Sequence, residues 1–340
     1  MRSFEKLIDT IFTAVLGAHQ GEPGYSVISE TQIEREKRNE FLFFLKPELL
    51  RDLRRSCFDA VLVLILEKLK KSELEVKSII ALSGDYLDTY GIMSSHYGVI
   101  DSVARDPITE ISDQGKGEFV NLSGRPMADS RVMGAFEYLS LHKELSADEL
   151  GRMWLERGYN KLSGGTYCQF IKDEDLYLFN GFYPRLLENF TRSGSSILAF
   201  IVQGDIEWSV ARQSLVGATN PEEAMTGSIR AELLQQREAL CIEEISPNLN
   251  GVHLSAGPVE GLVELRRFTT DYGVAGEKRP ITDFQFGRAL SAELSDREIE
   301  SVLGNTSVSV DQERISIFDL TEELDSKEAM ELLKWIRSSL

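Results

Sequence analysis

The sequence is poor in cysteine, in basic residues and in long apolar runs. Its 340 residues include only three cysteines, Cys57, Cys168 and Cys241, which lie far apart and form no C-x-x-C pair. This spacing predicts neither a disulfide framework nor a zinc site, and it favours a reducing compartment. The apolar run Val61–Leu66 is far too short to cross a bilayer. The first helical stretch has no cleavage site of a signal peptide, so we expect a cytoplasmic protein that does not bind membranes.

The deficit of basic residues narrows the choice of partners. There are 55 acidic and 37 basic residues, which gives a net charge of −18. Such a chain repels nucleic acid and anionic membranes, so neither is expected as a partner. A nucleotide site in this protein must therefore be a local basic pocket. The content of hydrophobic residues, 42%, is ordinary for a soluble globular protein of one large domain or two smaller ones.

Histidine is also scarce, with four in the chain, and one of the four lies within a dense run of motifs. His253 has Asn250 three residues before it and Ser255 two residues after it, and Glu264 follows eleven residues later. Two further motifs precede this N-x-x-H-x-S segment, namely Thr219-Asn220-Pro221 and Gly227-Ser228-Ile229-Arg230.

A second block of motifs lies upstream. The apolar run Phe41–Leu45 predicts a strand buried on both faces, and Lys46-Pro47-Glu48 follows it directly. A helix over Leu49–Lys71 and a strand over Val76–Leu82 come next, and a short helix over Asp85–Tyr97 then ends in His96-Tyr97.

Taken in this order, the motifs closely resemble those of the nucleoside diphosphate kinases. The resemblance implies an α+β fold with a ferredoxin-like βαββαβ core, in which surface helices cover an antiparallel sheet. The nucleoside diphosphate kinase-like core would comprise residues 39–105 and 181–275. An N-terminal helical extension (1–38), an inserted α+β subdomain (106–180) and a C-terminal hairpin and helix (276–340) would be added to it. The insertion is expected to act as a lid over the nucleotide or to be a surface decoration.

The resemblance also implies a reaction and its site. The γ-phosphoryl group of a nucleoside triphosphate would pass to a nucleoside diphosphate through a phosphohistidine at His253, with Ser255 and Glu264 holding the histidine. The implied nucleotide-binding residues are Lys46, Tyr97, Tyr183, Arg212, Thr219, Arg230 and Asn250. Among them, Asn250 would contact the ribose and Tyr183 the base. Mg²⁺ is implied through the nucleotide phosphates rather than in a protein site, and a homo-oligomer is expected.

The residue types suit this chemistry. A neutral imidazole is nucleophilic near pH 7 and forms a reactive phosphoramidate. Lys46 supplies a point charge and Arg230 a bidentate fork for phosphate oxygens. Because neither cation needs a partner in the nucleotide-free protein, we expect that their removal barely changes stability.

Four positions depart from the resembled pattern. Leu254 stands where a small residue is usual, and Ala256 stands where an acidic residue is usual. Gly181 stands where an arginine is usual. Gln213 aligns with another arginine, while Arg212 lies one place away, so a one-residue insertion would restore the match. These departures leave an alternative open: a catalytically impaired nucleotide-binding regulator or scaffold that keeps the fold.

The remaining segments give further structural expectations. Phe4 to Leu16 predict an amphipathic helix, and Ser146 opens a helix with a capping box. Other expected strands are Ile197–Val202 and Glu238–Glu244, and other expected helices are Ile206–Val216 and Val259–Phe268. Expected hairpins pair Thr166–Ile171 with Leu176–Phe179 and Ser307–Val310 with Arg314–Phe318, and Asp325 is expected to cap a last helix.

Overall fold

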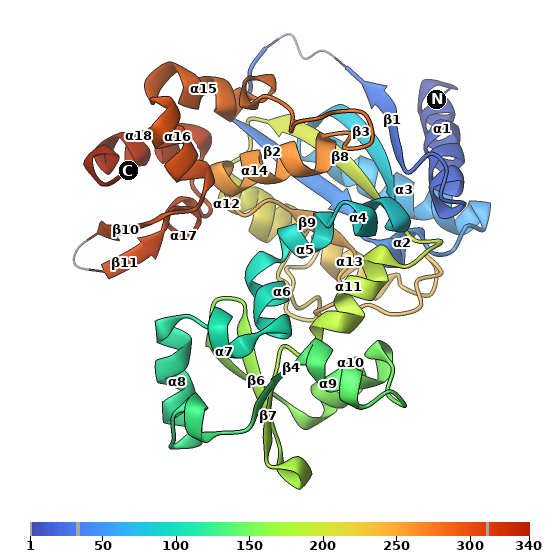
Figure 1. The fold of residues 1–340 in the computed structure, drawn as a ribbon. Helices are drawn as coiled ribbons and strands as arrows, with labels where there is room; N and C mark the ends of the chain where they lie inside the picture. Colours follow the sequence, from blue (N-terminus) through green and yellow to red (C-terminus); the bar gives the residue numbers. More distant parts are fainter. Residues whose placement is uncertain (1, 32–34, 311–312) are drawn as a thin grey trace. The chain divides into compact units, whose positions relative to one another are not determined.

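The structure is a computed structural model that describes residues 2–31, 35–310 and 313–340. Residues 32–34, within the predicted N-terminal extension, and residues 311–312, within the predicted C-terminal region, lie outside the described residues. The fold is α+β, with an antiparallel sheet and a mixed sheet (Figure 1). The chain forms two compact units: the first extends to Tyr86 and resumes at Ser193, and the second runs from Leu87 to Arg192.

The first unit is built on a five-stranded sheet in which every neighbouring pair is antiparallel. In spatial order the strands are β1 (Tyr25–Glu30), β3 (Glu75–Ser83), β8 (Ser196–Gly204), β2 (Asn39–Leu45) and β9 (Val252–Leu254). Every residue of β2 and of β8 is buried. Their continuous apolar runs fit this position, because helices cover both faces of the sheet. The three strands predicted at Phe41–Leu45, Val76–Leu82 and Ile197–Val202 are confirmed.

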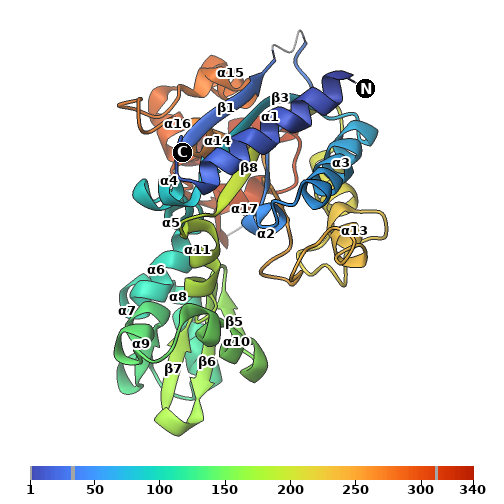
Figure 2. The same cartoon turned by 90° about the vertical axis from the view of Figure 1, so that its right-hand side faces the viewer.

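Different helices cover the two faces of this sheet. On one face, α1 (Arg2–His19) packs against β3 and β8, and α1 and α3 (Arg55–Lys71) share one hydrophobic core with Phe41 and Phe43 of β2 (Figure 2). On the other face, α14 (Pro258–Thr269) packs against β2, and the ring centroids of Phe44 and Phe268 are 5.2 Å apart. The helices predicted over Phe4–Leu16 and Val259–Phe268 are therefore confirmed.

The remaining elements of the first unit are short. The helices are α2 (Pro47–Leu50), α12 (Trp208–Val210), the π-helix Ala211–Val216, α13 (Ile229–Gln235), α15 (Gln285–Glu293), α16 (Asp296–Leu303), α17 (Ile317–Thr321) and α18 (Ser326–Trp335). A hairpin of β10 (Ser307–Val310) and β11 (Glu313–Ser316) precedes α17. Helix α4 (Gly84–Thr89) contains the boundary between the two units. Asp325 caps α18 through a capping box with Glu328, as predicted.

The long helices predicted over Leu49–Lys71 and Ile206–Val216 are each divided. Between α2 and α3, Asp52 Oδ1 accepts a hydrogen bond from the backbone N–H of Arg54 at 2.9 Å. This local bond gives the backbone an alternative to helical pairing and separates the two helices. In the second segment, a π-helical turn follows α12 directly.

Two further expectations differ from the structure. Strand β1 lies in a segment for which only a helix was predicted. It is an edge strand whose residues are half-buried or exposed, so its sequence lacks the apolar run of the central strands. The strand predicted at Glu238–Glu244 is wrong, because this segment forms turns and Cys241 has a φ of 57°.

The second unit contains a four-stranded mixed sheet in the order β4-β7-β6-β5. Its strands are β4 (Val132–Gly134), β5 (Asn160–Ser163), β6 (Thr166–Ile171) and β7 (Leu176–Phe179). Its helices are α5 (Ile92–His96), α6 (Gly98–Arg105), α7 (Pro107–Glu110), α8 (Asp113–Ser123), α9 (Ala135–Leu141), α10 (Ala147–Arg157) and α11 (Tyr183–Thr191). The β6–β7 hairpin and the capping box of α10 at Ser146 are confirmed.

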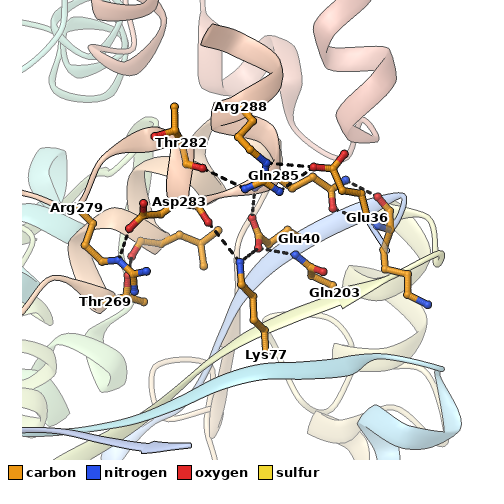
Figure 3. A network of polar contacts seen from close by, with 12 residues as sticks. Glu36, Glu40, Lys77, Gln203, Thr269, Arg279, Thr282, Asp283, Gln285 and Arg288 are labelled. Atoms are coloured by element: carbon orange, nitrogen blue, oxygen red, sulfur yellow. Dashed lines mark hydrogen bonds and ion pairs between the residues drawn. The ribbon is translucent and has the colours of Figure 1, made fainter. Parts of the chain in front are cut away.

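A buried polar network joins the sheet of the first unit to the segment before α15 (Figure 3). Glu40 of β2 accepts hydrogen bonds from Lys77 at 3.1 Å and from Gln203 at 2.6 Å. Its second oxygen accepts from the backbone N–H of Gln285 at 2.6 Å. Since a buried carboxylate is costly unless it is fully bonded, these contacts hold the C-terminal region against the sheet.

The expectation that the cysteines form no disulfide is wrong. Cys57 of α3 and Cys241 are joined by a disulfide bond, and Cys168 is free and buried. The two joined residues are 184 positions apart in the sequence, and the fold brings their Cα atoms to 5.7 Å. Spacing along the chain could not reveal this pair.

Breaking this disulfide should lower the free energy of unfolding by about 2–4 kcal/mol, because the crosslink restricts the unfolded chain. Urea unfolding with and without reductant measures the difference. Cys241→Ser should show the loss without reductant and no further change with it. In unfolded, unreduced protein we expect one reactive thiol, from Cys168. Three reactive thiols in that sample would contradict the crosslink.

No helix among the described residues is both long and apolar enough to cross a bilayer.

Candidate active site

The candidate site in the first unit is built around the short edge strand β9, which carries His253. Phe44 of β2 is the register partner of His253. Strand β9 begins after Gly251, whose φ is 80°, and a Cβ atom there would lie 2.5 Å from a methyl group of Leu233. Glycine is therefore required where the chain turns into this strand.

The imidazole of His253 is held from two sides. Its Nε2 atom lies 3.1 Å from Oε2 of Glu264, a buried carboxylate on α14. Its ring stacks on Phe44, with centroids 4.5 Å apart and an angle of 20° between the planes. About a fifth of the histidine side chain is exposed (20%). A buried carboxylate fixes the orientation of an imidazole and stabilises its positive charge.

Lys46 lies at the end of β2 and is almost completely buried. Its ammonium group donates to Oδ1 of Asn250 at 2.8 Å. The pKa of Lys46 is lowered to about 8, chiefly by burial; the charge of Arg230 also lowers it, and that of Glu48 opposes the shift. An ammonium group in such surroundings gains from an anionic ligand.

Asn250 is buried and links three segments of the chain. Besides accepting from Lys46, its Nδ2 donates to the carbonyl oxygens of Thr219 at 3.0 Å and Pro247 at 3.1 Å. These bonds occupy the polar atoms of the side chain that was predicted to contact a ribose. The ribose contact stays a prediction, and the structure gives Asn250 a structural role.

Arg230, on α13, binds two backbone carbonyls. Its Nη1 donates to Gly217 at 2.8 Å and its Nη2 to Val252 at 2.9 Å. Both Lys46 and Arg230 therefore have protein partners. The premise that neither cation is paired is wrong. We now expect the removal of either one to lower stability, because it would leave buried acceptors without a donor.

Arg212 occupies the π-helical turn Ala211–Val216. Its guanidinium forms ion pairs with Glu322 and, at 3.2 Å, with Glu323. The neighbouring Gln213 donates to Glu323 at 2.9 Å. A π-helical turn contains one more residue than an α-helical turn. The extra residue is an insertion of one position. An insertion of this size is what would align Arg212 with the expected arginine.

A cleft of about 440 Å³ in the first unit brings several of these residues together. Its walls include four of the predicted site residues, Arg212, Thr219, Arg230 and His253. Leu254 and Ala256, which depart from the resembled pattern, also line it. The cleft thus combines a nucleophilic side chain with two arginines.

Ser255 is buried beside this cleft, and its hydroxyl is bonded to β2. Its Oγ accepts from the N–H of Leu42 at 3.1 Å and lies 3.2 Å from the carbonyl oxygen of the same residue. The carbonyl of Ser255 accepts from the indole of Trp208 at 2.7 Å. The serine fastens β9 to β2, and its predicted role in holding His253 stays a prediction.

Tyr97 and Tyr183 belong to the second unit, whereas the residues of the cleft belong to the first. Tyr183 is fully buried and meets the rings of Tyr97 and Phe136 edge to face. Burial raises the pKa of its phenol, and Asp101 acts in the same direction. Their nucleotide contacts stay predictions.

The position of Gly181 cannot hold the arginine usual in the resembled pattern. A Cβ atom at Gly181 would lie 2.4 Å from the indole of Trp154. The two arginines considered as replacements bind carboxylates of the second unit, since Arg105 pairs with Asp101 and Arg185 with Asp148. Neither is shown to replace the missing cation.

Sequence reasoning missed several residues around the cleft. Glu260 precedes Glu264 by one helical turn on α14, a spacing that could have indicated a shared face. The pKa of Glu260 is raised to about 8, chiefly by burial and in addition by the charges of Glu264 and Glu322. Arg212 and Arg267 oppose this rise. Glu322, like Glu323, gave no signal, because the contact with Arg212 joins residues 110 positions apart.

Comparisons with known proteins give one weak similarity. No protein-family model and no curated protein matches the chain. Three similar solved structures are nucleoside diphosphate kinases, each with a TM-score of 0.34. The structure from Encephalitozoon cuniculi, an apo form, is 13% identical in sequence, and the match covers 68% of this chain and 89% of the kinase chain. The structure from Borrelia burgdorferi, a transition-state mimic with vanadate and ADP, is 16% identical in sequence. The match covers 71% of this chain and 92% of the kinase chain.

The third structure, from Pyrobaculum aerophilum, is 15% identical and covers 68% of this chain and 96% of its own. Similarity at this level is too weak to assign a family or a reaction to the chain.

Proposed function

We propose that this protein is a nucleoside diphosphate kinase-like phosphotransferase that moves a γ-phosphoryl group from a nucleoside triphosphate to a nucleoside diphosphate through His253. The observation that carries the proposal is the imidazole of His253 against the buried carboxylate of Glu264, in a cleft that two arginines also line. The strand order β3-β8-β2-β9, with helices after β2 and after β8, supports a ferredoxin-like βαββαβ core.

In the first half-reaction, we assign the proton of the neutral imidazole to Nε2, because the Glu264 carboxylate 3.1 Å away is an acceptor; the lone pair of His253 then lies on Nδ1. Nδ1 attacks the γ-phosphorus, and the bond from phosphorus to the bridging oxygen breaks, with its electron pair leaving on the nucleoside diphosphate. The phosphorylated imidazole is positively charged, and the Glu264 carboxylate stabilises this charge. The stack on Phe44 keeps the ring in place during the step.

In the second half-reaction, a terminal phosphate oxygen of the acceptor nucleoside diphosphate attacks the same phosphorus. The phosphorus–nitrogen bond breaks, and its electron pair returns to Nδ1 of His253. The two steps are alike, so one set of cations serves both. Arg212 and Arg230 line the cleft, and Lys46 lies beside Arg230. Their charges suit the negative charge that phosphoryl transfer spreads over the phosphate oxygens.

Mg²⁺ would enter with the nucleotide and bridge its phosphate oxygens. Two carboxylates line the cleft, Glu223 and Glu323, and both have protein partners. We therefore propose Mg²⁺–nucleotide as the substrate rather than a metal held by the protein. The partners are nucleoside triphosphates and diphosphates, and a homo-oligomer stays a prediction.

The second candidate is a nucleotide-binding regulator or scaffold with little or no turnover. The engagement of all three cations by protein groups favours it. Arg212 is paired with carboxylates, Arg230 with carbonyls and Lys46 with Asn250. A cation held in this way stabilises a phosphate less in the transition state than one that is already directed at it.

A pulse of γ-labelled ATP with Mg²⁺, followed by a chase with unlabelled nucleoside diphosphates, distinguishes the two candidates. A kinase is expected to form an acid-labile, base-stable phosphoprotein, and the chase should transfer the label to nucleoside triphosphate. Parallel chases with different diphosphates would reveal the preferred base. Nucleotide binding without labelling would support the scaffold, and the absence of both would contradict the proposed function.

A further inference from the structure

The C-terminal region contributes a turn to the candidate cleft. Residues 322–324 form the turn that follows α17, and Glu323 in this turn lines the cleft with His253 and Arg230. The backbone N–H of Glu323 donates to the carbonyl of Ala256 at 2.9 Å. Glycine at position 257 allows this approach, since a Cβ atom there would lie 2.4 Å from the carbonyl oxygen of Thr321.

The turn is held in place by the buried carboxylate of Asp325, which follows it. Asp325 Oδ1 accepts from the side chain of Asn39 at 2.6 Å and from the backbone N–H of Trp208 at 2.8 Å. Arg38 forms an ion pair with the other carboxylate oxygen. These contacts tie the turn to the start of β2 and to α12, next to the turn that carries Arg212.

Held in this way, Glu322 and Glu323 both bind the guanidinium of Arg212. Two carboxylates on one guanidinium occupy donors that are suited to phosphate oxygens. The two carboxylates also bring two negative charges to Arg212, where the negatively charged phosphates of a nucleotide would bind. Charges of the same sign repel at this range, and the side chains are only partly exposed, so solvent screens the repulsion incompletely.

We propose that the acidic pair Glu322–Glu323 is a built-in competitor for nucleotide phosphates and lowers the affinity of the cleft for them. The inference rests on the proposed function, because it places the phosphates at Arg212. Binding of a nucleotide exchanges the carboxylates for phosphate oxygens on the guanidinium. No covalent step is involved.

The test is the dissociation constant of ADP with Mg²⁺ for the full chain, measured by calorimetry. We expect the double variant Glu322→Gln/Glu323→Gln to bind ADP about three- to tenfold more tightly than the original chain, as for the loss of two partly exposed ion pairs. The substitution keeps the size of each side chain and removes only its charge. If the double variant does not fold, Glu322→Gln alone should show a smaller change in the same direction.

The same region offers a matched control. Lys334 is paired with Glu293 at 3.2 Å and with Glu331 at 3.7 Å, and neither glutamate lines the cleft. Glu293→Gln/Glu331→Gln therefore changes the net charge equally and also frees a cation from two carboxylates. Its dissociation constant should stay within about twofold of the original, because distant exposed charges are screened by salt.

The outcomes separate the inference from the proposed function. Tighter binding in the test variant than in the control supports the competitor. Binding by the original chain without a gain in the test variant overturns it and leaves the proposed function intact. Weaker binding in the test variant also overturns it, since the glutamates would then orient Arg212 for the ligand. A failure of every variant to bind ADP overturns both.

Discussion

His253→Ala is expected to remove all phosphoprotein labelling by γ-labelled ATP. The reason is chemical: without the imidazole, the cleft loses the nitrogen that we propose accepts the phosphoryl group. Removal of a nucleophile typically costs several powers of ten in rate. The fold should survive, because the side chain is partly exposed and lies on a short strand at the edge of the sheet.

His142→Ala is a suitable control for this experiment. His142 lies in the second unit, is partly exposed, and is paired with Glu144. Its loss should leave the labelling unchanged. Full labelling of the His253→Ala protein, at the stoichiometry of the original chain, would assign the phosphoryl acceptor to another residue.

Glu264→Gln probes the same site without removing the nucleophile. The amide can still bind Nε2 of His253, but it cannot balance the positive charge of a phosphorylated imidazole. We expect labelling to persist at a rate lower by about 10- to 100-fold, as for the loss of a carboxylate that supports an imidazole. An unchanged rate would show that the contact at 3.1 Å has only a structural role.

The sequence predicts the central strands and α14 well, for a physical reason. Phe41–Leu45 and Ile197–Val202 lie in strands buried on both faces, so a continuous apolar run is required there. Strand β1 lies at the edge and needs only partial burial, and its pattern is correspondingly weak. The break between α2 and α3 depends on a local side-chain bond of Asp52, which periodicity does not detect.

Contacts between distant parts of the chain account for most of what the sequence could not give. The disulfide joins residues 184 positions apart, and the pair of Arg212 with Glu322 spans 110 positions. Neither has a spacing that indicates proximity. His253 and Glu264 are only eleven positions apart, within one strand, turn and helix, so the motif could carry their pairing. The partners of Lys46 and Arg230 were missed, since both residues were considered only as ligands of phosphate.

Arg230→Ala is expected to lower kcat/KM by about two to three powers of ten, the loss that follows removal of a preorganised electrostatic contact, roughly 2–4 kcal/mol. The same change should destabilise the fold by about 1–3 kcal/mol, because the carbonyls of Gly217 and Val252 lose their donors. Both quantities must therefore be measured, by steady-state kinetics and by urea unfolding.

Two further variants separate the loss of charge from the loss of structure. Ser228→Ala removes the N-cap of the helix that carries Arg230, at a cost of about 1 kcal/mol in stability, but keeps the guanidinium. Its turnover should stay within a few-fold of the original. Arg230→Lys keeps the charge and loses the fork, so its kcat/KM should fall between those of the original and of Arg230→Ala. Arg230→Ala could instead keep its turnover within about a factor of two, an effect far below that of a lost transition-state contact. In that case Arg230 acts only on the fold, and the phosphate must be held by Lys46 and Arg212.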